Sequence, residues 1–174
     1  KSISRSLLKW YHSTARDLPW RRSPDPYRVW VSEIMLQQTQ VERVKDYFHR
    51  FVTKFPSVFD LAEADEAVVL KYWEGLGYYR RARQLHAAAK LIVSDHEGIF
   101  PHDACALRQL PGVGRYTAGA ISSISFDLPE PILEANSRRV LARLTHYGRP
   151  LSGNKDDQPL WDIAAAIVPR DGGA

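Results

Sequence analysis

One nine-residue stretch, Leu110-Pro111-Gly112-Val113-Gly114-Arg115-Tyr116-Thr117-Ala118, constrains the fold more than any other part of the chain. A proline and two glycines one residue apart, followed by small and apolar residues, predict a tight turn that opens a helix. Glycine adopts φ > 0 without steric cost, so the backbone at Gly112 and Gly114 can approach a ligand closely. The unpaired N–H groups of the next helix favour an anion, and Arg115 adds positive charge. The turn is a candidate phosphate site; the alternative is an ordinary helix-turn-helix corner.

Helical periodicity recurs along the chain, and we find no convincing strand, so the predicted fold class is all-α. The first helix contains Leu7, Leu8 and Tyr11, and the prolines at 19, 24 and 26 make residues 16–26 a loop. Further helices are expected at residues 27–36, from 39 through 51, from 57, from 65 to the glycines at 75 and 77, and at 80–96, 103–110, 116–125, 136–144 and 160–168.

Two features of this pattern concern single residues. Thr39 and Glu42 have the spacing of a capping box, so a helix is expected to begin at Thr39, after a glutamine-rich turn whose amides can reach base edges. The one cysteine, Cys105, has no partner for a disulfide or a metal site, and we interpret it as a small buried hydrophobe on a short helix.

Charge and composition restrict the partners. The chain has 174 residues, enough for one domain or two small lobes, and a formal net charge of +4, which suits a polyanion. Basic residues cluster at Arg21-Arg22, Arg80-Arg81-Arg83 and Arg138-Arg139-Arg143, as expected of a surface that follows a phosphate backbone; solvated helix faces are the alternative. No apolar run approaches the ~18 residues of a membrane span. We expect a fragment of a longer, intracellular protein.

Two carboxyl groups lie in contrasting surroundings. Glu33 is flanked by Trp30 and by Ile34-Met35-Leu36, and burial among such residues raises the pKa of an acid; the alternative is a Glu that points outward on an amphipathic helix. Glu134 lies between a proline-rich loop and a helix start, where N–H groups and Arg138 favour the ionised form. One protonated and one ionised acid are the pair that cleavage of a glycosidic bond needs.

Four segments carry a family resemblance. They are Leu18-Pro19-Trp20-Arg21, then Val31 to Val41 with its Ser-Glu-Ile-Met-Leu-Gln-Gln-Thr-Gln run, then Gly75-Leu76-Gly77-Tyr78-Tyr79 with Arg81-Ala82-Arg83, and Leu110 to Ala120. Together they resemble the MutY-type adenine DNA glycosylases of the helix-hairpin-helix superfamily, which remove adenine mispaired with 8-oxoguanine. The resemblance extends from about Trp10 to Arg143.

The resemblance implies a six-helix barrel at residues 27–135 with its helix-hairpin-helix at about 103–125, beside a second helical lobe made of residues 1–26 plus 136–174. It makes Glu33 the acid that protonates N7 of a flipped adenine, and Glu134, followed by the matching Asn136, the stabiliser of the sugar cation. Tyr116 stands where strand-cutting relatives have lysine, which implies a monofunctional enzyme in which the hydroxyl orients a carboxylate.

Two further sets of residues come from the same resemblance. The base pocket is implied for Arg16, Leu18, Trp20, Arg21 and Val41. Contacts to DNA are implied for Gln38, Thr39, Leu76 and Tyr78, which fill the gap left in the duplex, and for the hairpin residues Gly112, Val113, Gly114 and Arg115.

The chain departs from the family pattern at three points. Glu134-Ala135 replaces aspartate-glycine, which moves the carboxylate by one methylene. The four cysteines that hold the family's 4Fe-4S cluster are expected beyond residue 174, so we expect no cofactor or metal bound here. The C-terminal domain with which the family helps to recognise 8-oxoguanine is likewise expected outside these 174 residues.

The expected partner is double-stranded DNA with an A:8-oxoguanine or A:G mismatch, bound by a monomer in the cytoplasm or nucleoid. A thymine-mismatch glycosylase of the same superfamily and a non-catalytic DNA-binding module are the alternatives.

Overall fold

The computed structural model describes residues 2–149, 151 and 158–169. In these residues every regular element is helical, which confirms the all-α prediction. The elements are α1 (Ser2–Thr14), the 3₁₀ turn η1 (Pro19–Arg21), α2 (Pro26–Leu36), α3 (Val41–Lys54), α4 (Val58–Glu63), α5 (Glu66–Trp73), α6 (Arg80–His96), α7 (Ala104–Leu107), α8 (Arg115–Phe126), α9 (Ala135–Leu144) and α10 (Gln158–Ile167).

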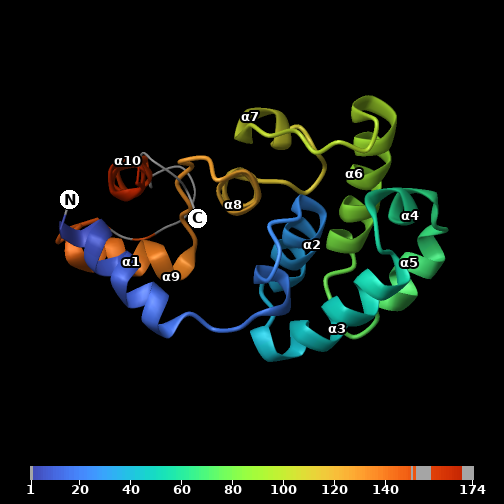
Figure 1. Cartoon of the computed structure of the whole chain (residues 1–174), viewed down its shortest axis with the longest axis horizontal. Coiled ribbons are helices and arrows are strands. Elements are labelled where there is room, and N and C mark those ends of the chain that lie inside the picture. Colours follow the sequence, from blue (N-terminus) through green and yellow to red (C-terminus); the bar gives the residue numbers. More distant parts are fainter. Residues whose placement is uncertain (1, 150, 152–157, 170–174) are drawn as a thin grey trace.

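The helices fall into two groups, which Figure 1 shows side by side. Helices α2 to α6 and α8 pack around the larger hydrophobic core, and α1, α9 and α10 lie together on the other side. A second, smaller core joins α9 to α10 through Leu133, Leu160 and Trp161. The hydroxyl of Ser4 donates to the carbonyl of Ile167 at 2.6 Å, which ties α1 to α10. Segments from both ends of the chain therefore build one lobe.

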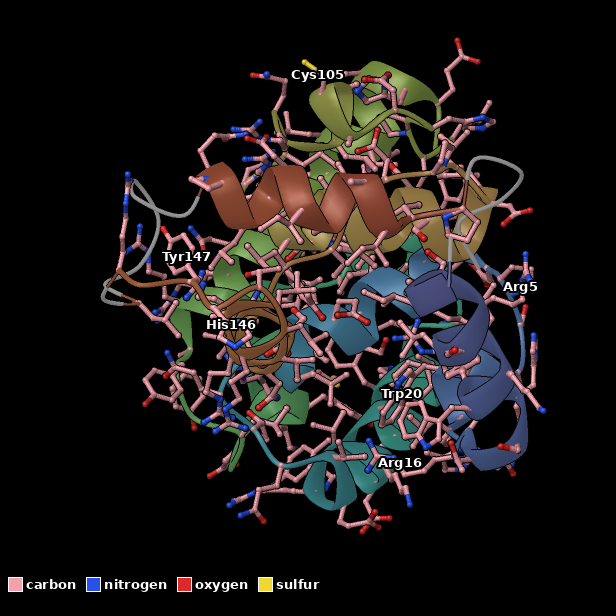
Figure 2. The ribbon with its side chains drawn as sticks, turned by 90° about the vertical axis from the view of Figure 1, so that its left-hand side faces the viewer. Arg5, Arg16, Trp20, Cys105, His146 and Tyr147 are labelled. Atoms are coloured by element: carbon pink, nitrogen blue, oxygen red, sulfur yellow. The ribbon has the colours of Figure 1, made fainter. Side chains whose placement is uncertain are left out.

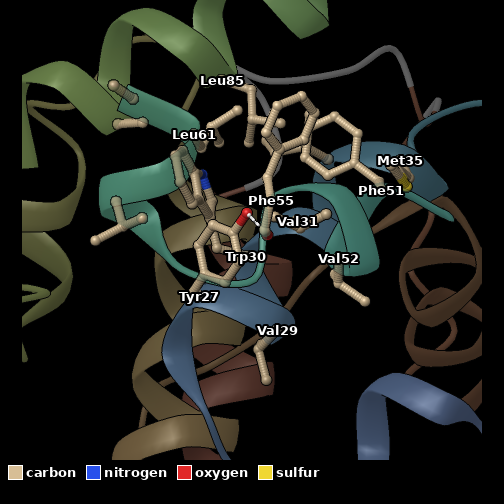
Figure 3. Packing of buried hydrophobic residues seen from close by; sticks show 14 of the residues in the cluster. Tyr27, Val29, Trp30, Val31, Met35, Phe51, Val52, Phe55, Leu61 and Leu85 are labelled. Atoms are coloured by element: carbon tan, nitrogen blue, oxygen red, sulfur yellow. Dashed lines mark hydrogen bonds between the residues drawn. The ribbon is translucent and has the colours of Figure 1, made fainter. Parts of the chain in front are cut away.

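Helix α2 runs through the middle of the larger core. Its side chains are buried on all sides from Val29 to Met35, as expected for a helix that is apolar around its whole circumference. Asp25 accepts a hydrogen bond from the N–H of Tyr27 and begins the helix. The Tyr27 hydroxyl donates to the carbonyl of Phe55 at 2.6 Å, across the packing of aromatic rings in Figure 3. Any polar side chain in the middle of α2 is consequently desolvated.

The glycine hairpin joins α7 to α8. Gly112 has φ +77°, and a β-carbon there would lie 2.9 Å from Cβ of Gln84, so this position requires glycine. Gly114 has φ −88° and ψ 179° as the N-cap of α8, and no atom lies within 4 Å of the position of a β-carbon. The backbone thus uses the conformational freedom of glycine at Gly112, whereas at Gly114 the absent side chain leaves open space.

Three other local predictions are wrong. Cys105 is exposed on the short helix α7, with its sulfur at the outer edge of the molecule (Figure 2). Thr39 does not cap α3: the N-cap is Gln40, without a side-chain bond, because the Thr39 hydroxyl bonds to Gln37 and Arg81 instead. Residues 19–21 of the predicted loop form the single turn η1.

Candidate active site

Glu33 lies at the centre of the site. Its side chain is 1% exposed in the middle of α2, which excludes the outward-pointing alternative and confirms the predicted desolvation. Oε1 accepts a hydrogen bond from Nη2 of Arg21 at 3.2 Å, and Oε2 accepts one from the hydroxyl of Tyr116 at 2.8 Å. Burial raises the pKa of the Glu33 carboxyl, and both donors oppose that shift by favouring the ionised form. Burial is the largest of these effects, so the net shift favours the protonated form and this acid is suited to carry a proton.

Tyr116 is the hydrogen-bond partner of the buried acid. It is the second residue of α8, which packs directly against α2. Burial raises the pKa of its phenol, and the negative charge of Glu33 raises this pKa further, with the smallest contribution in the same direction from Glu134. The fold thus places a hydroxyl beside Glu33 from a position 83 residues away in the sequence.

Glu134 is held by the start of α9. The helix begins at Ala135, one residue before the predicted start at 136, and Glu134 is its N-cap. Its Oε1 accepts the N–H groups of Asn136 at 2.7 Å and Ser137 at 2.9 Å, and the Ser137 hydroxyl accepts the N–H of Glu134 at 2.8 Å. Two N–H donors orient the Glu134 carboxyl. The side chain of Asn136 is exposed, and its Oδ1 accepts a bond from Arg139.

A glycine that the sequence did not point out lets the loop before Glu134 pass close to α8. A β-carbon at Gly119, inside α8, would lie 2.7 Å from the carbonyl oxygen of Pro131. Because that oxygen belongs to backbone, no side chain fits at this position. The loop before Glu134 crosses α8 one turn after Tyr116 for this reason.

A cleft of about 690 Å³ opens beside Arg21, between α1 and the larger lobe. Arg16, Leu18 and Arg21 line it, three of the five residues predicted for the base pocket. The other two do not: Trp20 is 1% exposed and packs edge-on against Phe48, and Val41 is half-buried at the start of α3. Within the described residues, the buried indole N–H of Trp20 has no hydrogen-bond partner.

The residues predicted to enter DNA lie on two turns. Gln38 and Tyr78 are exposed, Tyr78 at 64%, and both adopt the left-handed backbone, with φ of 56° and 49°. Thr39 is half-buried. Leu76 is 6% exposed and packs into the core, so it does not project beside the other three.

The hairpin residues also differ among themselves. Gly114 is exposed, whereas Val113 is 6% exposed and belongs to the core. The guanidinium of Arg115 lies 3.9 Å from the ring centre of Trp161, and Nη1 donates to Oε1 of Gln158 at 3.0 Å. Arg115 thus contacts α10 and connects the two lobes in this structure.

Sequence reasoning missed Arg81, which we grouped with a basic surface cluster. Its side chain is 8% exposed, between the turn that bears Gln38 and the turn that bears Tyr78. The signal was its register: Arg81, Leu85, Ala88 and Ile92 follow helical spacing and share the buried face of α6.

The described residues contain no group of three or more His, Cys, Asp or Glu that could hold a metal ion. A 4Fe-4S cluster needs a set of cysteines, and the whole chain has only Cys105, so these residues do not fit that cofactor. None of the described helices has the length and apolar composition required to cross a membrane.

The sequence profile of the HhH-GPD superfamily base excision DNA repair proteins matches residues 31–156. An adenine DNA glycosylase of Buchnera aphidicola subsp. Acyrthosiphon pisum is 42% identical over 168 residues, covering 96% of this chain and 48% of the relative. The adenine DNA glycosylase of Homo sapiens is 45% identical over 172 residues, covering 94% and 32%. The chain thus spans about half or one third of the length of these relatives.

Two solved structures share the fold. A thermostable thymine-DNA glycosylase has a TM-score of 0.82 at 28% identity, covering 97% of this chain and 78% of that one. Endonuclease III in a non-covalent complex with DNA has a TM-score of 0.81 at 19% identity, and the match covers 98% of this chain and 77% of that one.

Proposed function

Because the chain belongs to the HhH-GPD superfamily of base excision DNA repair proteins, we propose that it hydrolyses the N-glycosidic bond of adenine in DNA, when adenine is paired with 8-oxoguanine or guanine. The relatives of 42 and 45% identity are adenine DNA glycosylases, which supports adenine as the base. The observation that carries the proposal is the buried Glu33, hydrogen-bonded to Tyr116 and Arg21 beside the cleft.

In the proposed reaction the protonated Glu33 donates its proton to the leaving base. The bond between the sugar and the base then breaks with its electron pair on the base, which leaves as neutral adenine. Burial raises the pKa of Glu33, so more of the enzyme holds this proton near neutral pH than an exposed glutamate would. Arg21, which lines the cleft and bonds to Glu33, fixes the direction of the carboxyl group.

The sugar left behind carries positive charge, and Glu134 is the group that stabilises it. The two N–H bonds at the start of α9 hold its carboxyl in place before the reaction, so little reorganisation is needed as charge develops. Water then adds to the sugar and leaves its proton to the ionised Glu33, which restores the acid. The product is an abasic site in an uncut strand.

Strand cutting is not part of the proposal. A covalent intermediate on the sugar requires an amine that forms a Schiff base, and Tyr116 offers a phenol at the position next to Glu33. The duplex must also release the adenine from its stack, because buried groups such as Glu33 cannot reach a base inside the helix. Gln38 and Tyr78, exposed on their turns, are the residues we assign to the vacated space.

The test compares wild type with Glu33→Gln on duplexes that contain A:8-oxoguanine, A:G or T:G. We expect wild type to release adenine and leave the strand uncut until alkali is added. Glu33→Gln keeps the size of the side chain but has no acidic proton, so we expect its release rate to fall by about 100-fold or more. Glu63→Gln, a change at an exposed carboxyl on α4, is the matched control and should behave as wild type.

Release of thymine instead of adenine would assign the chain to the second candidate, a thymine-mismatch glycosylase, which the structural match at 28% identity favours. Adenine release at the wild-type rate by Glu33→Gln would remove the assignment of the acid. Duplex binding without release of any base would reduce the chain to a DNA-binding module.

A further inference from the structure

Arg81 joins the end of α2 to the turn that follows it. Its Nη1 donates to three carbonyl oxygens there, those of Ile34 at 3.0 Å, Met35 at 3.1 Å and Gln37. Backbone carbonyls at the end of a helix have no intrahelical partner, and the helix dipole favours a cation beside them. A side chain of α6 therefore completes the C-terminus of α2.

The second terminal nitrogen of Arg81 serves a different turn. Nη2 donates to the carbonyl oxygens of Leu76 at 3.3 Å and Gly77 at 3.4 Å. The Thr39 hydroxyl lies 3.4 Å from both nitrogens and closes the space between the two turns. One planar guanidinium thus spans segments that are about 40 residues apart in sequence, with one nitrogen for each turn.

The carbonyls that Arg81 binds lie directly before the two exposed residues. Gln37 precedes Gln38, and Gly77 precedes Tyr78, so these hydrogen bonds fix the orientation of the peptide units that lead into them. The first turn is of type II, with Gln37 at φ −58° and ψ 112° and a bond from Thr39 N–H to Leu36 C=O. That turn prefers glycine where this chain has Gln38.

Both exposed residues have a strained backbone. Gln38 and Tyr78 adopt φ of 56° and 49°, a region that non-glycine residues occupy at a cost and only where their surroundings hold them. The guanidinium of Arg81 also lies 5.4 Å from the ring centre of Tyr78. One buried side chain therefore holds the backbone before both residues and contacts one of their rings.

From this arrangement we propose that Arg81 is a positioning residue, which sets the spacing of Gln38 and Tyr78 so that both side chains enter one duplex as a fixed pair. The inference rests on the proposed function, because it assigns a role in opening the duplex. Arg81 itself is buried, so the role we assign to it acts through the two turns that it holds.

The test is a double-mutant cycle. Arg81→Lys keeps the charge, but a single ammonium cannot reach both turns, so we expect adenine release from A:8-oxoguanine duplexes to fall about tenfold or more. In a Gln38→Ala, Tyr78→Ala background the same change should cost less than about twofold, because the residues it positions are already gone. Arg28→Lys is the matched control, because Arg28 is a half-buried arginine whose guanidinium packs over Phe48. It should release adenine at the wild-type rate.

A purely structural role for Arg81 predicts a different result: Arg81→Lys would then reduce the rate by the same factor in both backgrounds, which would overturn the proposal. If Arg81→Lys does not fold, as judged by thermal melting, Thr39→Val takes its place in the cycle, with the same two outcomes. The emission of 2-aminopurine at the mismatched position gives a readout without base release. Wild type should brighten it on binding and Arg81→Lys should not, even if adenine proves not to be the excised base. Equal brightening by both would contradict the inference alone.

Discussion

The hydrogen bond from Tyr116 to Glu33 makes a quantitative prediction for Tyr116→Phe. The hydroxyl donates at 2.8 Å to a carboxyl group that is 1% exposed, so water screens the interaction little. A hydrogen bond to a charged group contributes about 1.5–3 kcal/mol. Losing this bond should therefore raise the pKa of Glu33, because the energy that favoured its ionised form is removed.

The sign follows from the role of the bond. It stabilises the ionised carboxylate and lowers a pKa that burial has raised, so its removal lets that pKa rise further. Glu33 acts as an acid only while protonated, and the rate therefore falls as pH increases through its pKa. Tyr116→Phe should move this alkaline limb to higher pH, whatever happens to the maximal rate.

The assay is single-turnover adenine release from an A:8-oxoguanine duplex, measured from about pH 5 to about pH 9. Tyr27→Phe is the control, because that hydroxyl bonds to the carbonyl of Phe55 and not to Glu33. The alkaline limb of the pH–rate profile of Tyr27→Phe should stay at the wild-type position. An unchanged limb in Tyr116→Phe, or one displaced to lower pH, would refute the electrostatic reasoning.

Three other predictions concern the hairpin glycines, Glu134 and the buried His86. Gly112→Ala should lower the free energy of unfolding by about 1–2 kcal/mol because alanine is strained at φ +77°. Gly114→Ala should change the free energy of unfolding by less than about 1 kcal/mol but weaken duplex binding. Melting curves and DNA titrations of both variants measure these effects. Glu134→Ala should lower the free energy of unfolding by about 0.5–2 kcal/mol, because the N-cap is lost, and it should also slow adenine release. Glu134→Gln should keep the N-cap and lower only the rate of release. Unchanged release in both variants would exclude Glu134 from the reaction. Burial lowers the pKa of His86, so the native state binds its proton less readily than the unfolded chain, and stability should decline as pH falls through the unfolded value of about 6.5. In His86→Leu, the melting temperature should fall less than in wild type as the pH is lowered through this value.

Much of the local structure follows from the sequence. Helices α2 and α4 begin within one residue of the predicted positions 27 and 57, and α6 runs from Arg80 to His96 as the periodicity predicts. The burial of Glu33 was also predictable, because apolar residues surround it in the sequence as they do in the fold. These features depend on neighbours within about one or two helical turns, which a sequence displays directly.

Prediction from the sequence is less reliable where a side chain can bond or pack either with its neighbours in sequence or with a distant part of the fold. Thr39 has the spacing of a cap, yet its hydroxyl bonds to Arg81, 42 positions away. Cys105 is apolar enough for a core, but α7 turns it outward. Leu76 and Val113 come from turns that the family resemblance assigns to DNA, and both point into the core.

By itself the sequence determined the number and approximate positions of most helices and the buried acid on α2, because hydrogen bonds within a helix and the spacing of its apolar residues are local. Only the tertiary structure decided that Tyr116 donates to Glu33, that Gly114 leaves space while Gly112 bears strain, and that Arg81 holds two turns together. Each of these depends on atoms that the chain brings together from distant positions. A buried guanidinium beside carbonyl groups from two turns must hydrogen-bond to them and so holds the turns together, whereas the same side chain in water bonds to solvent and constrains neither turn.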